Sequence, residues 1–176
     1  MDILDAIFYR TSYRGSYLPT PVPEAHLRTI LEAGVAAPSG CNRQTASFIA
    51  VDDPALLERI RAAIAPCQGE TAPALICVLT KPAEGNVRSY QKQDYAAAIE
   101  NMLLACVALG YESCWVEGRI TEADRLGRRI ADVLGVPQEY DLVCYLPIGK
   151  AAEPLSHVKK RPFAARASFN GFQTER

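Results

Sequence analysis

Apolar residues recur along this chain in two patterns, one typical of helices and one typical of buried strands. Spacings of three and four residues predict four helices, over residues 2–9, 24–36, 54–64 and 93–109. The last of these is apolar around much of its circumference, so we expect it to be central or to lie at an interface. Thr121 is expected to cap a fifth helix that runs to residue 134, and Gly135 to end it.

Short apolar runs between these helices predict four strands, over residues 48–51, 74–79, 113–116 and 142–148. The run 74–79 is apolar throughout, which is typical of a central strand covered on both faces. The polar segment 81–91 is expected to be mobile or to form a lid. Because strands alternate with helices and no linker or repeat interrupts them, we expect one α/β or α+β domain over residues 1–176.

Composition narrows the class of protein. The chain has 176 residues, of which 49% are apolar and 22% charged, as in a soluble globular domain. A net charge of −1 argues against a nucleic-acid or membrane-surface binder, which would carry an excess of Lys and Arg. The acidic start Met1–Asp5 is unlike a signal peptide, and no apolar run reaches the ~18 residues of a membrane span. We therefore expect a cytoplasmic protein.

Six cysteines are present, and no two have a CxxC or CxxH spacing that would support a zinc site or a redox dithiol. Most lie in apolar runs, where free cysteine acts as a small hydrophobic residue in a reducing compartment. Cys41 and Cys67 are the best candidates for exposure, and a redox role for any cysteine stays open.

The common catalytic signatures are missing, since the chain has no GxSxG, HExxH, P-loop or GxGxxG motif. What remains are basic and amide residues in loops. Arg10 and Arg14 are four residues apart, so one helical turn would place both on one face, with Ser12 between them. Two guanidinium groups and a hydroxyl suit a phosphate. Taken alone the pattern is weak, because such residues are also common on solvated surfaces.

Several motifs in collinear order make the pattern specific. Arg10-x-Ser12-x-Arg14 comes first, followed by a helix that ends in Ala36–Gln44, with the sequence AAPSGCNRQ. The hydrophobic helix Asn101–Gly110 and the segment Ser113–Gly118 come next, and Ile148–Lys150 and Lys159–Pro162 close the series. In this arrangement the chain resembles the FMN-dependent nitroreductase family over nearly its whole length.

The resemblance implies an α+β sandwich with a central mixed, mainly antiparallel sheet and a C-terminal segment that extends to a partner subunit. It implies a homodimer with FMN at the subunit interface, the phosphate held by Arg10 and Ser12 together with Lys159 and Arg161. Arg14 would approach the pyrimidine edge, residues 38–42 would approach the ring from the partner subunit, and a backbone N–H near Glu117 and Gly118 would bond flavin N5. The implied cofactor-binding set is Arg10, Thr11, Ser12, Arg14, Pro38, Ser39, Gly40, Asn42, Gln68, Trp115, Val116, Glu117, Gly118, Lys159 and Arg161.

The implied activity is hydride transfer from NADH or NADPH through FMN N5 to a small acceptor such as a nitroaromatic or a quinone. The cofactor carries this chemistry, so no side chain is assigned as a catalytic residue. Thr45-Ala46 departs from the family pattern, which leaves the start of the following strand open. Segment 81–91 replaces what is often a longer helical excursion over the flavin, so the acceptor is not inferred. Two alternatives stay open: a same-fold flavoenzyme with other chemistry, such as dehalogenation or flavin fragmentation, and a non-catalytic flavin-binding redox module.

Overall fold

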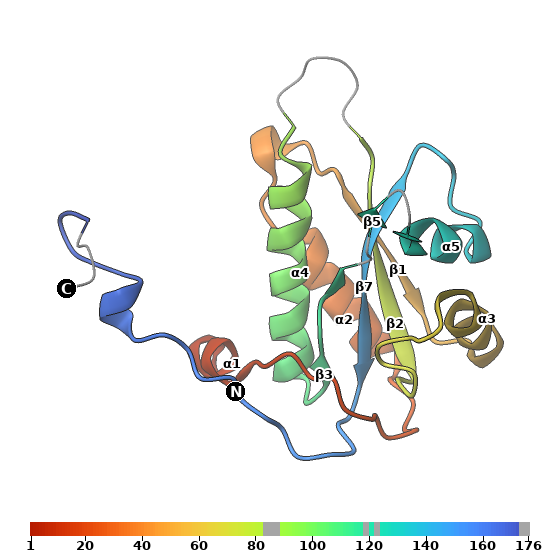
Figure 1. Ribbon diagram of the computed structural model, residues 1–176, viewed down its shortest axis with the longest axis horizontal. Helices are drawn as coiled ribbons and strands as arrows, with labels where there is room; N and C mark the ends of the chain where they lie inside the picture. The colour runs from red at the N-terminus through yellow and green to blue at the C-terminus, as the bar shows by residue number, and fades with distance from the viewer. Residues whose placement is uncertain (83–88, 118–119, 122–123, 173–176) are drawn as a thin grey trace.

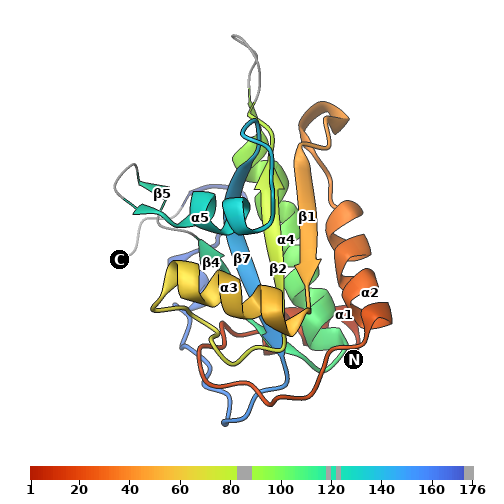
Figure 2. The same cartoon turned by 90° about the vertical axis from the view of Figure 1, so that its right-hand side faces the viewer.

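A five-stranded sheet forms the middle layer of the molecule and carries helices on both faces (Figures 1 and 2). The computed structural model describes residues 1–82, 89–117, 120–121 and 124–172. The strand order is β1-β2-β7-β3, and β4 also pairs with β7. The strands are β1 (Ala46–Val51), β2 (Ala74–Thr80), β3 (Glu112–Ser113), β4 (Val116–Glu117) and β7 (Asp141–Gly149). Every strand pairing in the described part of the chain is antiparallel, which confirms the expected α+β class.

The helices divide between the two faces of the sheet. They are α1 (Ile3–Tyr9), α2 (Glu24–Val35), α3 (Pro54–Ile64), α4 (Gln91–Ala108) and α5 (Leu126–Val133). Helices α2 and α4 cover one face, and α3 and α5 cover the other (Figure 2). One apolar cluster, which includes Ile30, Ile76 and Met102, fills the first layer, and a second, which includes Ile60, Leu75 and Tyr145, fills the other. The expected sandwich is thus confirmed.

Strand β2 lies between β1 and β7, and all of its residues are buried. Its side chains point alternately into the two apolar clusters, so an uninterrupted apolar run is what this position requires. Each fully buried Leu or Ile there contributes about 1.5–3 kcal/mol relative to an exposed one. The sequence-based prediction of a strand covered on both faces is confirmed.

The expected helix over residues 121–134 is wrong at its start. Ile120–Thr121 (β5) pairs with Asp124–Arg125 (β6) as a small antiparallel ribbon, and α5 begins only at Leu126. Thr121 is therefore no helix cap. Backbone pairing within the ribbon takes the place of the first helical turn, which the capping pattern alone could not reveal.

The strand expected over residues 113–116 is divided into β3 and β4. Both pair with β7 in one continuous register, Ser113 opposite Ile148 and Val116 opposite Tyr145. The break falls at residues 114–115, and the same register puts Pro147 opposite residue 114. Proline has no N–H to donate to a ladder, so an interrupted pairing beside it has a local cause.

The two ends of the chain carry exposed apolar side chains. Helix α1 turns its apolar stripe outward, with Phe8 80% exposed, and only Ala6 of this helix is buried. The C-terminal segment, residues 152–172, runs past α1 and away from the sheet (Figure 1). It exposes three phenylalanines, Phe163, Phe169 and Phe172, of which the last is 92% exposed.

Candidate functional site

A cleft of about 390 Å³ opens between the loop after α3, strand β4 and helix α5. Gln68, Val116 and Glu117, three residues of the predicted cofactor-binding set, line this cleft. Ile64 and Leu126 add apolar walls beside the polar groups of Gln68, Glu117 and Arg129. Clefts of this size and character are typical binding sites for small organic molecules.

Hydrogen bonds fix the loop that carries Gln68. The buried Tyr145 hydroxyl donates to the Gln68 carbonyl oxygen at 3.1 Å and lies 3.6 Å from Cys67 Sγ. Burial raises the pKa of the Tyr145 phenol, so this group stays a donor throughout the physiological range. The Gln68 side-chain amide donates to the Arg14 carbonyl oxygen at 3.2 Å. The Arg10–Arg14 segment and the cleft are therefore joined directly.

The Arg10–Arg14 segment is extended rather than helical, which corrects the expected one-turn geometry. Helix α1 ends at Tyr9, and the Tyr13 N–H donates to the Ser113 carbonyl oxygen of β3 at 3.0 Å. Alternation in an extended chain then buries Thr11 and Tyr13 and leaves Ser12 and Arg14 exposed on the opposite side, with Arg10 half-buried. The two arginines and the serine still share one face, with a period of two instead of four.

Other segments hold the beginning of this face in place. Arg10 Nε donates to Glu100 Oε1 of α4 at 3.2 Å, which orients the guanidinium group. The Thr11 hydroxyl donates to the Ser156 carbonyl oxygen at 2.9 Å, and the Tyr9 and His157 rings meet edge to face at 5.5 Å. The C-terminal segment is thereby attached beside Arg10.

Lys159 and Arg161 are both exposed and lie three and five residues beyond Ser156. An extended chain covers at most about 3.6 Å per residue, so Lys159 lies within roughly 11 Å of this attachment. The attachment at Ser156 thus keeps Lys159 within reach of the segment that carries Arg10 and Ser12, whereas Arg161 can lie farther away.

The predicted loop 38–42 lies elsewhere, at the N-terminal end of α4. Asp94 is buried and accepts from the Gly40 N–H at 2.7 Å and from the Thr45 hydroxyl at 2.8 Å. The Gln44 N–H donates to Ser39 Oγ at 2.9 Å. Cys41 and Asn42 adopt left-handed φ values of 56° and 53°, which non-glycine residues rarely do unless their surroundings enforce them.

Loop 38–42 and the cleft are thus separate within one chain. Pro38 and Ser39 border a small cavity beside α2, and neither borders the cleft with Gln68. Within one chain, the predicted cofactor-binding residues therefore do not all line one cavity.

Trp115 and the end of β4 complete the predicted set. The Trp115 ring meets Tyr95 of α4 edge to face at 6.3 Å, and its buried Nε1 has no hydrogen-bond partner among the described residues. Glu117 is exposed at the cleft. Gly118 lies outside the described residues, as do positions 83–88 of the expected lid segment 81–91.

Sequence reasoning missed four side chains that shape the site. Arg129 and Tyr145 line the cleft, while Glu100 and Asp94 position Arg10 and loop 38–42. The signal for Asp94 was available, since an acidic residue on the apolar side of helix 93–109 requires a partner when buried. Arg129 and Tyr145 gave no such signal. In the sequence, Arg129 is indistinguishable from an ordinary surface residue of a helix, and Tyr145 from an ordinary core residue of a strand.

In the described part of the chain, no cluster of His, Cys, Asp or Glu could hold a metal ion. Among the same residues, no helix combines the length and apolar character needed to cross a membrane.

Comparison with known proteins gives the family. The sequence model of the nitroreductase family matches residues 7–71 and 67–150, and the chain belongs to that family. A curated relative, an NADH dehydrogenase of Thermus thermophilus, is 30% identical over 189 residues, covering 87% of this chain and 88% of the relative.

Two solved structures extend the likeness to the fold. A nitroreductase with bound FMN from Bacteroides fragilis is 30% identical, with a TM-score of 0.76 over 96% of this chain and 98% of that one. An FMN-dependent nitroreductase from Clostridium difficile is 25% identical, with a TM-score of 0.81 over 96% of this chain and 99% of that one. The fold of the present chain is therefore that of the nitroreductases.

Proposed function

We propose that this chain is an FMN-dependent oxidoreductase that passes electrons from NADH or NADPH to a small acceptor such as a nitroaromatic or a quinone. The observation that carries this proposal is the extended segment in which Arg10, Ser12 and Arg14 share one face and Gln68 joins Arg14 to the cleft. The names of the relatives, an NADH dehydrogenase and two FMN proteins, support the reductant and the cofactor.

The residues present fit both the phosphate end and the ring end of FMN. A phosphate dianion suits guanidinium and hydroxyl donors, as supplied by Arg10, Ser12 and, from the C-terminal segment, Lys159 and Arg161. A flat ring suits a cleft with apolar walls and the Gln68 amide at its edge.

Bound FMN supplies hydride acceptance and donation at its N5 atom. The protein's part would be binding and electrostatics. Arg14 would place a positive charge where negative charge collects on the reduced flavin, and a backbone N–H next to Glu117 would serve as the donor to N5. Apolar walls from Ile64 and Leu126 exclude water. No side chain needs to act as nucleophile or general acid.

We further propose that the whole chain acts as one FMN-binding unit in a homodimer. The outward apolar stripe of α1 and the phenylalanines of the C-terminal segment support this, because large exposed apolar patches mark protein–protein contact sites. In this assembly the C-terminal segment would pack against the partner subunit, and loop 38–42 would contact the partner's flavin. A cytoplasmic location is proposed too, since all six cysteines are free thiols.

The decisive experiment is a visible spectrum of the purified protein, with and without NADH and NADPH. We expect flavin absorbance that bleaches when the reductant is added and returns with an acceptor. Colourless protein that takes up no added FMN would refute the proposal. Flavin that binds but never bleaches would favour a non-catalytic binding module.

The phosphate ligands are tested by Arg10→Ala and Arg161→Ala. Loss of a charged hydrogen-bond donor should weaken FMN binding by about 1.5–3 kcal/mol, measured by fluorescence titration. Arg59→Ala, an exposed cation on α3, is the matched control and should leave the affinity unchanged. Unchanged affinity in both test variants would contradict the assignment.

A further inference from the structure

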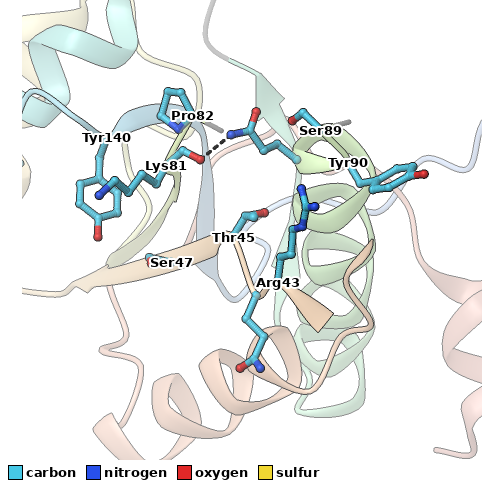
Figure 3. Close-up of a pocket in the computed structure, with 10 residues that line it drawn as sticks. Arg43, Thr45, Ser47, Lys81, Pro82, Ser89, Tyr90 and Tyr140 are labelled. Carbon is cyan, nitrogen blue, oxygen red and sulfur yellow. Dashed lines mark hydrogen bonds between the residues drawn. The ribbon is translucent and has the colours of Figure 1, made fainter. Parts of the chain in front are cut away.

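A second cavity, of about 500 Å³, lies where β2 ends and α4 begins, at the end of the sheet away from α1 (Figure 1), and Figure 3 shows its lining. Its walls come from four separate parts of the chain: the loop after η1 (Gly40–Asn42), the end of β2, the start of α4 and the turn before β7. Its volume suits an organic molecule of one or two rings and exceeds what a simple inorganic anion requires.

The described lining of this cavity contains cationic side chains on two of its walls. Arg43 and Lys81 contribute two cations, and no acidic side chain occurs among the described lining residues. Figure 3 shows Lys81 pointing toward Tyr140 on one side, while Arg43 rises toward the start of α4 on the other. Three residues with hydroxyl groups, Thr45, Ser47 and Ser89, also line the cavity. An anion is therefore the ligand charge that this lining favours.

The backbone that carries Lys81 is held on both sides. Its N–H donates to the Thr45 carbonyl oxygen at 3.4 Å, and its carbonyl oxygen accepts from the Gln91 side-chain amide. The buried nearby carboxylate of Asp94 is engaged by the Gly40 N–H and the Thr45 hydroxyl, so it braces this wall rather than neutralising the cavity. The cation-bearing wall is thus preorganised.

The position of the cavity links it to the reaction. Arg43 and Thr45 follow directly on loop 38–42, which in the proposed homodimer reaches the partner's flavin. A molecule held by Arg43 would therefore adjoin the loop that is proposed to contact the partner's flavin.

We propose that this cavity binds the anionic group of the electron acceptor, so that the preferred acceptors are small aromatic compounds carrying a carboxylate. The inference rests on the proposed function. Tyr140 and Pro82 provide flat surface for the ring of the acceptor, and the two cations hold its charge.

The test compares 4-nitrobenzoate with 4-nitrobenzamide, which differ in charge but hardly in shape, in the FMN-loaded protein. We expect higher kcat/KM for the nitrobenzoate, with a preference that shrinks as salt is added. Lys81→Gln and Arg43→Gln should each lower kcat/KM for nitrobenzoate about three- to fivefold through KM, the size typical of an exposed ion pair, and leave nitrobenzamide unaffected. Arg59→Gln is the control for a general change in surface charge.

Equal effects on both acceptors, or an effect confined to NADPH, would overturn the proposal. Calorimetric titration with benzoate, which is not reduced, separates this inference from the proposed function. If the protein bound benzoate in a Lys81-dependent way but showed no NAD(P)H turnover, the cavity would be an anion site. Its proposed role in binding the electron acceptor would then be overturned. Turnover without benzoate binding or charge preference would overturn the cavity assignment alone.

Discussion

Asp94 should be the residue on which the geometry of loop 38–45 depends. Its carboxylate is buried, and its two oxygens each accept one hydrogen bond, from Gly40 and from Thr45. A hydrogen bond to a charged group contributes about 1.5–3 kcal/mol. Because both donors are half-buried and regain some hydration, we expect Asp94→Ala to lower the free energy of unfolding by about 2–4 kcal/mol.

Asp94→Asn should cost less, because an amide oxygen still accepts from the Gly40 N–H. The Thr45 hydroxyl can turn and accept from the new amide, so the loss should be about 1 kcal/mol. Lys92→Ala, an exposed change on the same helix, is the control and should stay within about 0.5 kcal/mol of the unchanged protein.

The assay is urea denaturation at one fixed protein concentration, since a dimer's stability depends on concentration. The expected order of loss is Asp94→Ala, then Asp94→Asn, then Lys92→Ala. Under native conditions the alanine variant should also bind FMN more weakly, because loop 38–42 is proposed to reach the partner's ring. Equal losses for the alanine and asparagine variants, or a loss no larger than that of Lys92→Ala, would refute the reasoning.

Three further predictions concern burial. Burial raises the pKa of the Glu112 carboxyl, so its pKa in the folded protein exceeds that in the unfolded chain. The free energy of unfolding therefore falls as the pH rises from the unfolded pKa through the folded one. Glu112→Gln lacks this loss, so its stability relative to the native chain should increase from pH 4 to pH 8 in thermal melts. A difference that is constant with pH would contradict this. Gly127→Ala should destabilise α5 by about 1–3 kcal/mol, because a Cβ there would lie 2.2 Å from the backbone oxygen of Leu142; an unchanged denaturation midpoint would argue against that close packing. Cys41 should be alkylated first in the native protein and Cys67 more slowly, because burial raises the pKa of the Cys67 thiol. Mass spectrometry after timed iodoacetamide treatment measures the order, and equally fast alkylation of Cys67 would refute it.

The sequence predicted the elements whose apolar pattern is long and regular. Helices α2, α3 and α4 lie within a residue or two of the expected spans, and β2 is covered on both faces as expected. The ribbon of Ile120–Thr121 and Asp124–Arg125 was missed because two-residue strands have no periodicity to detect. Pairing with another segment, not local propensity, decides such short elements.

The candidate site was predictable in its residue types but not in its geometry. Arg10 and Arg14 share a face because the segment is extended against β3, whereas the spacing alone suggested a helical turn. Arg129 and Tyr145 become visible only when α5 and β7 are packed beside the Gln68 loop. Contacts between distant segments carry this information, and no local motif contains it.

The position of β7 also affects how the chain must be made. This strand pairs with β2 on one side and with β3 and β4 on the other, yet it is the last strand of the sheet in sequence. The fully buried β2 therefore leaves the ribosome about 70 residues before β7, an interval of roughly 4–14 s at ordinary rates of synthesis. During that time β2 is an open sheet edge with the character of an aggregation-prone segment. We therefore expect newly made chains to depend on chaperones until residue 149 has emerged, even though the finished sheet is well covered.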